Sequence, residues 1–242
     1  MQALSLPLKA VIDPVGTIPK AIAQRRWLVP LLLLALFTAL SGVALALKVD
    51  PSRPVLSKME RTGELAKATE REVEEAIQQA QRVAIVGSVA KGVFLTPLWV
   101  LLLAVVLKVT GWLIGKKATF VECFTAAALS LLPVALFHGI ELLAALRQDA
   151  LSPKMAEVLV PSSLAALKGG GPPRLERVFA ALDVINVWSA LLLGLGFSAA
   201  TKWSPWKGAL LGLFLYVLFA GAFLIGVPGI MANAPGMGGG SR

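Results

Sequence analysis

Long runs of apolar residues, interrupted by short polar segments, are the dominant pattern along this chain of 242 residues. A run of about 20 apolar residues can cross roughly 30 Å of hydrocarbon as an α-helix. Lipid offers the backbone no hydrogen-bond partners, so a segment that spans it must be an α-helix or a strand of a closed β-barrel. Barrel strands alternate polar and apolar residues, and these runs do not, so we expect helices. The runs predict five transmembrane spans, at residues 27–47, 93–114, 119–146, 178–200 and 206–230.

The first of these runs must be distinguished from a cleavable secretory signal. Residues 44–46, Ala-Leu-Ala, resemble a signal-peptidase site, and Arg25-Arg26 resembles part of a twin-arginine signal. The run at 27–47 is nevertheless longer than the roughly 7–15 apolar residues of a secretory signal. We therefore expect it to be retained, which gives an all-α polytopic membrane fold with five transmembrane helices.

A charged stretch separates spans one and two. Residues 55–90, within a predicted outer loop at 48–92, are rich in the helix formers Glu, Lys, Arg, Gln and Ala and predict a charged extramembrane helix. Small apolar residues recur on one face of this helix: Met59, Ala66, Val73, Ile77, Ala80 and Ala84. Two interpretations stay open, a solvated extension of span two and a docking surface for a protein partner.

The remaining segments outside the spans are short. Residues 1–26 combine prolines, apolar residues and basic residues, a composition typical of a lead-in that lies along the cytoplasmic interface. A second outer loop at 147–177 contains an amphipathic stretch followed by a Gly-Gly-Gly-Pro-Pro breaker. Residues 231–242 are rich in glycine and predict a flexible tail.

Composition supports the membrane assignment and narrows the function classes. The chain is 57% hydrophobic and 15% charged, whereas soluble domains are about 45–50% apolar and about 25% charged. One cysteine excludes a disulfide framework, and one histidine excludes metal centres built on two or three histidines. The net charge of +9 is spread along the chain, so we expect contact with the lipid bilayer and no nucleic-acid binding.

The distribution of basic residues predicts the orientation in the membrane. Lysines and arginines occur in the lead-in and in the two short turns that join spans two to three and four to five, which all lie on one side. The positive-inside rule makes that side the cytoplasm, with the N-terminus inside and the C-terminus outside. The residues concerned are Lys9, Lys20, Arg25, Arg26, Lys116, Lys117, Lys202 and Lys207.

Three ionisable side chains fall inside the predicted spans. His138 and Glu141 are three residues apart in span three, and Asp183 and the polar Asn186 lie at matching depths in span four. Ionisable groups at mid-membrane cost about 2.5–3.5 kcal/mol on insertion scales, so a shared polar cluster is expected. It could fix helix packing, handle protons or ions, or bind a metal, for which His138, Glu141 and Asp183 are weak candidates. We assign no metal and no cofactor.

Other features concern helix packing and the start of span three. Pro133 predicts a kink in span three, and Glu122 and Cys123 at its start are expected to be exposed. No nucleophile or phosphate-binding motif is present in the sequence, so no catalytic residue is assigned. Small residues permit close helix approach, and the predicted packing glycines are Gly194, Gly196, Gly208 and Gly212.

Four features of the membrane portion occur together. They are the lead-in PLKAVIDPVGTIPKAIAQRRWLVPLLLLAL, span three with its central Pro133, the segment LDVINVWSALLLGLGFSAATKWSPWKGALL, and five spans with a cytoplasmic N-terminus. This pattern resembles the Yip-one (Ypt/Rab-interacting protein) domain family, in its bacterial branch. Residues 55–90 look like an insertion relative to it. The resemblance implies a polytopic, non-enzymatic protein without established catalytic residues.

These observations lead to one expected function and two alternatives. Eukaryotic relatives act with small GTPases in vesicle traffic, but the short lead-in lacks a substantial cytoplasmic domain, so that role is not carried over. We expect a bacterial inner-membrane scaffold or accessory subunit for membrane, envelope or transport components, which contacts a protein partner through residues 55–90. One alternative is a small-solute or proton-coupled ion transporter that uses the His/Glu/Asp cluster, and the other is a membrane metalloprotein.

Overall fold

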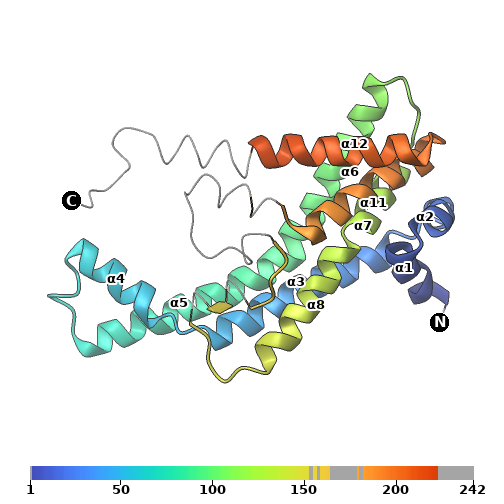
Figure 1. The fold of residues 1–242 in the computed structure, drawn as a ribbon. Helices are drawn as coiled ribbons and strands as arrows, with labels where there is room; N and C mark the ends of the chain where they lie inside the picture. The colour runs from blue at the N-terminus through green and yellow to red at the C-terminus, as the bar shows by residue number, and fades with distance from the viewer. Residues whose placement is uncertain (1, 153–154, 157–158, 164–178, 180–181, 223–242) are drawn as a thin grey trace. The chain divides into compact units, whose positions relative to one another are not determined.

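Helices account for the regular structure of the protein. The computed structural model describes residues 2–152, 155–156, 159–163, 179 and 182–222, and within them no β-strand is formed (Figure 1). Five helices in these residues are long and apolar enough to cross a membrane. The predicted all-α polytopic membrane fold is therefore confirmed.

The five membrane-spanning helices follow the apolar runs, with differences at their ends. Those differences are largest for the second, which begins 23 residues before the predicted start at residue 93, and the fourth, which begins six residues after residue 178. The tail at 231–242, residues 223–230 of predicted span five and most of the loop at 147–177 lie outside the described residues. The observed helices are Leu28–Lys48, Glu70–Leu113, Phe120–Leu146, Val184–Thr201 and Pro205–Ala222.

The chain forms two compact units, each of which is described by itself. Unit one comprises Met1–Leu31, Val100–Val134 and Pro161–Arg242, and unit two comprises Leu32–Trp99 and Ala135–Val160.

Helix α11 (Val184–Thr201) is the centre of unit one. It packs against α2 (Pro14–Ala23), α7 (Phe120–Ser130) and α12 (Pro205–Phe219), and its Phe197 is fully buried. The face that α7 presents is built from small residues, which allows a close approach of helices where lipid provides no hydrophobic driving force. Its buried residues are Cys123, Thr125, Ala126, Ala127, Ala128, Leu129 and Ser130.

The predicted interfacial lead-in forms two short helices. Helix α1 (Gln2–Ile12) packs against α2, and Asp13 caps α2 by accepting a hydrogen bond of 3.1 Å from the Gly16 amide. One face of α2 is buried against α7 and α11, through Ile18 and Ala21 among others. The lead-in thus packs against the membrane helices, with Lys9, Lys20 and Arg25 exposed and Arg26 partly buried.

Span three is interrupted near its middle, close to the proline that predicted a kink. Helix α7 ends at Ser130, Leu131 leaves helical geometry, and α8 (Leu132–Leu146) follows. Pro133 explains the interruption, because it has no amide hydrogen to donate and its ring collides with the carbonyl group four residues earlier, that of Leu129.

In unit two, α3 (Leu28–Lys48) and the chain from α5 to α6 pack closely through small residues. A β-carbon added to Gly42 would lie 2.8 Å from the Ser88 β-carbon, and one added to Gly92 would lie 2.6 Å from the Ala35 carbonyl oxygen. Gly92 belongs to η1 (Lys91–Leu95), a π-helical segment that joins α5 (Glu70–Ala90) to α6 (Thr96–Leu113). These glycines were not predicted as packing positions.

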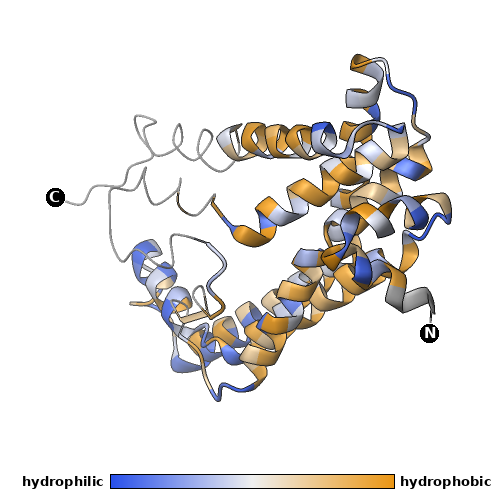
Figure 2. Ribbon diagram, turned by 45° about the vertical axis from the view of Figure 1, so that its right-hand side comes forward, coloured by the Kyte–Doolittle hydropathy of each residue, from blue (hydrophilic) through white to orange (hydrophobic). Residues whose placement is uncertain are grey.

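The predicted charged extramembrane segment at residues 55–90 is helical, but it forms two helices and not one. Helix α4 (Ser52–Thr62) ends at Gly63, whose φ of 73° is a left-handed conformation that favours glycine, and α5 begins only at Glu70. Hydrophilic residues gather on α4 and the outer turns of α5 (Figure 2). Helix α5 then continues through η1 into α6, so the second half of the charged segment is an extension of span two.

Candidate functional site

The four residues of the predicted polar cluster belong to different units. His138 and Glu141 lie on α8 in unit two, whereas Asp183 and Asn186 belong to unit one.

In unit two, His138 and Glu141 form a hydrogen-bonded pair. Nδ1 of His138 lies 2.9 Å from Oε2 of Glu141, and both side chains are less than one-fifth exposed. The buried Ser41 of α3 places its hydroxyl 3.4 Å from the same ring nitrogen. A nucleophilic triad requires serine and carboxylate on opposite ring nitrogens, so this arrangement is not a triad.

The exposed Lys91 has a smaller electrostatic effect on this site. Its ammonium group interacts electrostatically with the Glu141 carboxylate, which also interacts with the Ser41 hydroxyl. We refer to Ser41, Lys91, His138 and Glu141 as the polar cluster of unit two. Sequence reasoning missed Ser41 and Lys91, although a serine inside an apolar run and a lysine at the boundary of a span were visible signals.

In unit one, Asp183 acts as a helix cap. Its carboxylate accepts hydrogen bonds from the backbone amides of Ile185 and Asn186, at 2.8 Å and 3.0 Å, and from the Ser162 hydroxyl. Helix α11 begins at Val184, so the placement of Asp183 inside a span that starts at residue 178 is wrong. Aspartate is among the preferred residues for this capping position because it satisfies otherwise unpaired amides.

The described residues contain no group of three or more His, Cys, Asp or Glu side chains arranged to hold a metal ion.

Glycines bring α11 and α12 into backbone contact. A β-carbon on Gly194 would lie 1.9 Å from the Gly208 carbonyl oxygen, and one on Gly212 would lie 2.0 Å from the Ala190 carbonyl oxygen. On another side of α11, a β-carbon on Gly196 would lie 2.7 Å from the Ala126 β-carbon of α7. All four predicted packing glycines thus lie where a side chain would collide with a neighbouring helix.

The start of span three differs from expectation at one residue. Cys123 is fully buried, so its predicted exposure is wrong. It lies on the same face of α7 as the buried Ala126 and Ala127, which are three and four residues further on. Glu122 instead forms a capping box, in which its carboxylate accepts a hydrogen bond of 2.7 Å from the Thr119 amide.

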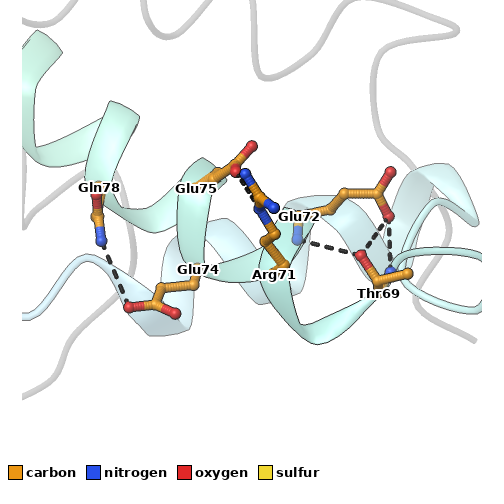
Figure 3. Close-up of polar contacts among 6 residues, drawn as sticks. All are labelled: Thr69, Arg71, Glu72, Glu74, Glu75 and Gln78. Atoms are coloured by element: carbon orange, nitrogen blue, oxygen red, sulfur yellow. Dashed lines mark hydrogen bonds and ion pairs between the residues drawn. The ribbon is translucent and has the colours of Figure 1, made fainter.

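The outer helices α4 and α5 contain no buried residue. Polar side chains of α5 pair with one another (Figure 3). Arg71 forms an ion pair of 2.9 Å with Glu75, and Gln78 donates a hydrogen bond of 3.4 Å to Glu74. Closer to the membrane span, Val83 and Val86 are 63% and 67% exposed. We call the exposed residues of α4 and α5, from 52 to 90, the outer helix surface.

The comparison with known protein families gives one match, which covers nearly the whole chain. No curated protein and no solved structure matches this sequence. The Yip1 domain, in contrast, matches residues 8–227, a range that includes the charged segment expected to be an insertion. The five apolar helices fit this assignment. The chain therefore belongs to the Yip1 domain family and is a multi-pass membrane protein.

Proposed function

We propose that this Yip1-family protein is a non-enzymatic scaffold or accessory subunit that binds a protein partner through its outer helix surface. The observation that carries the proposal is the length and exposure of the helix from Glu70 to Leu113. Its 44 residues make a helix of about 66 Å, roughly twice the hydrocarbon thickness of a bilayer. Much of α5 must therefore project from the lipid, and none of its residues is buried.

The chemistry of this surface suits the binding of another helix. Charged residues, including Arg71 and Glu75, cover the outer turns, and exposed valines at 83, 86 and 89 form a small apolar strip. Interfaces commonly combine an apolar centre with a polar rim, and helices recognise one another through apolar residues spaced three or four apart. We place the protein in a bacterial inner membrane with its N-terminus in the cytoplasm, which puts this surface outside.

Site-specific crosslinking in native membranes tests the proposal. A photoreactive residue placed at Val83 is expected to give one discrete protein adduct, which the additional change Val86→Glu abolishes. The same residue placed at Leu102, an exposed position of α6 within the apolar span, serves as the control and is expected to give lipid adducts only. A folded, membrane-inserted protein that gives no discrete protein adduct from Val83 would count against the scaffold function.

The polar cluster of unit two supports a second candidate, proton-coupled transport of an ion or small solute. Ionisable side chains inside membrane-spanning segments are commonly found in proton relays. Here a histidine and a carboxylate pair beside a buried serine, and the exposed Lys91 has a smaller electrostatic effect on the carboxylate. Flux across proteoliposomes under a pH gradient is expected to disappear in His138→Gln and Glu141→Gln. Asp183→Asn is the matched control, because asparagine caps helices as well as aspartate does.

A further inference from the structure

Unit one contains a hollow of about 280 Å³ between the lead-in and the ends of two membrane helices. Pro14, Val15 and Pro19 of α2 line one side, and Leu195 and Ala199 of α11 line the other. These walls are apolar. The volume is close to the lower end of the roughly 300–1,000 Å³ range of ligand sites, so the hollow accommodates a group the size of a lipid headgroup.

Lys202 and Trp203, in the turn that joins α11 to α12, also line the hollow, together with Ser198 and Pro205. Lys202 is exposed and ends α11 in a left-handed conformation with φ of 52°. The Trp203 amide donates a hydrogen bond of 2.8 Å to the Ser198 carbonyl oxygen, and its ring packs edge-on against the buried Phe197. The turn thus holds the Trp203 ring against Phe197 and places an exposed lysine beside it.

The hollow lies where the chain passes from lipid to water. Helix α11 ends at Thr201 and α12 begins at Pro205, so Leu195 belongs to the last turns of a span while Lys202 lies just beyond it. Lysine and tryptophan are typical of this interfacial zone, where headgroups are found. A second cation, Lys207, lies in the first turn of α12, and one carboxylate, Asp13, precedes Pro14 and accepts a hydrogen bond from the Gly16 amide.

We propose that this hollow binds the headgroup of an anionic phospholipid. The phosphate pairs with the Lys202 ammonium group, and the first methylene groups of the lipid contact Val15, Leu195 and Ala199. A free phosphate compound fits the lining less well, because a doubly charged anion would lose water to apolar walls and gain a single cation. The acyl chains remain in the surrounding bilayer.

Native mass spectrometry of the full chain in detergent, titrated with phosphatidylglycerol or with phosphatidylcholine of the same acyl chains, tests the proposal. The wild-type protein is expected to retain one phosphatidylglycerol in preference to phosphatidylcholine. Lys202→Gln is expected to raise the dissociation constant of that lipid about tenfold, as for the loss of one charge-assisted hydrogen bond. Lys117→Gln removes the same charge from another exposed turn between spans and is expected to leave binding unchanged.

Two further variants separate binding from folding. Lys202→Arg keeps the charge and is expected to retain the lipid, and Ala199→Leu fills the hollow without changing the charge and is expected to weaken binding. Equal losses in Lys202→Gln and Lys117→Gln, equal affinities for the two lipids, or undiminished binding in Ala199→Leu would each overturn the proposal. Glycerol 3-phosphate that binds as tightly as the lipid would overturn the assignment to a lipid headgroup.

Discussion

Glycines, whose side chain is a single hydrogen atom, set the spacing between α11 and α12. Gly194 and Gly208 each lie so close to the other's carbonyl group that a methyl group cannot be inserted without separating the helices. Within a membrane the packing of small residues is a main source of helix association. The integrity of unit one therefore depends on a few glycines.

Replacing Gly208 by alanine is expected to destabilise the protein by about 1–3 kcal/mol, the usual cost of overpacking. The added methyl group would lie 2.3 Å from the Gly194 carbonyl oxygen, which is backbone and cannot rotate away. The measurement is thermal unfolding in detergent, followed by size-exclusion chromatography. Gly87→Ala is the control, because no atom lies within 4 Å of its added β-carbon and alanine favours helix by about 0.5–1 kcal/mol. Equal unfolding temperatures for the two variants would contradict the prediction.

Asp50 makes the stability of the first turn of α4 depend on pH. Hydrogen bonds from Ser52, including one of 2.9 Å from its amide, lower the pKa of the Asp50 carboxyl below its ordinary value. Because the folded pKa is lowered, the contribution to stability is present above the ordinary aspartate pKa of about 3.9. It is lost as the pH falls through the folded pKa.

Acidification below this range is therefore expected to loosen the first turn of α4. The observable is the amide resonance of Ser52, whose chemical shift and hydrogen exchange are expected to change together at acidic pH. In Asp50→Asn the same resonance is expected to stay constant over that range. If the Ser52 amide resonance of the wild-type protein does not change with pH, this hydrogen bond does not form.

The sequence predicted pairs of residues within a helix better than contacts between helices. The spacing of three residues placed His138 and Glu141 on one face, and they are hydrogen-bonded. Ser41 was visible as a serine inside an apolar run, but its pairing with His138 could not be inferred, because that depends on which helix packs beside α8. Asp183 was misplaced because the apolar residues before it continue the hydrophobic pattern and conceal the start of α11.

Among the elements, the spans were easier to predict than the charged segment. An apolar run long enough to cross a bilayer has few possible structures other than a membrane-spanning helix. Residues 55–90 have a helix-forming composition throughout, so their composition alone does not show where α4 ends and α5 begins. Two local signals mark it, the glycine at position 63 and the capping box formed by Thr69 and Glu72. Capping residues thus mark the ends of these helices, a signal that the prediction from average composition did not use.

Loss of the cap is expected to fray the outer end of α5. The Thr69 hydroxyl oxygen accepts a hydrogen bond from the Glu72 amide, and the Thr69 amide donates one of 2.7 Å to the Glu72 carboxylate. Thr69→Ala is expected to cost about 0.5–2 kcal/mol of local stability, measured as faster hydrogen exchange of the Glu72 amide. Thr62→Ala is the comparison variant, because Thr62 bonds only to carbonyl groups of its own turn. Unchanged exchange in Thr69→Ala would show that the cap is dispensable.

At the scale of the whole molecule, the orientation in the membrane determines where each surface acts. The predicted topology puts Lys58 of α4 outside and Lys117 of the turn between α6 and α7 inside. Both residues are exposed, and Cys123, the single native cysteine, is fully buried. This combination makes cysteine labelling selective.

In intact cells, Lys58→Cys is expected to react with a membrane-impermeant maleimide, and Lys117→Cys is expected to react only after permeabilisation. The two variants make the same substitution, so they differ only in location. The native chain gives the background from Cys123, which is expected to be low because the thiol is buried. The reverse pattern of labelling would invert the assigned orientation and place the outer helix surface in the cytoplasm.

The helical backbone that runs from Glu70 to Leu113 has a mechanical consequence. Gly42 and Gly92 hold it against α3, so the two helices cannot slide freely past one another. Because the two helices are in contact at these glycines, a force that tilts the distal turns of α5 would act on α3 as well. A partner that binds the outer turns of α5 would then change the tilt of α3 within the membrane.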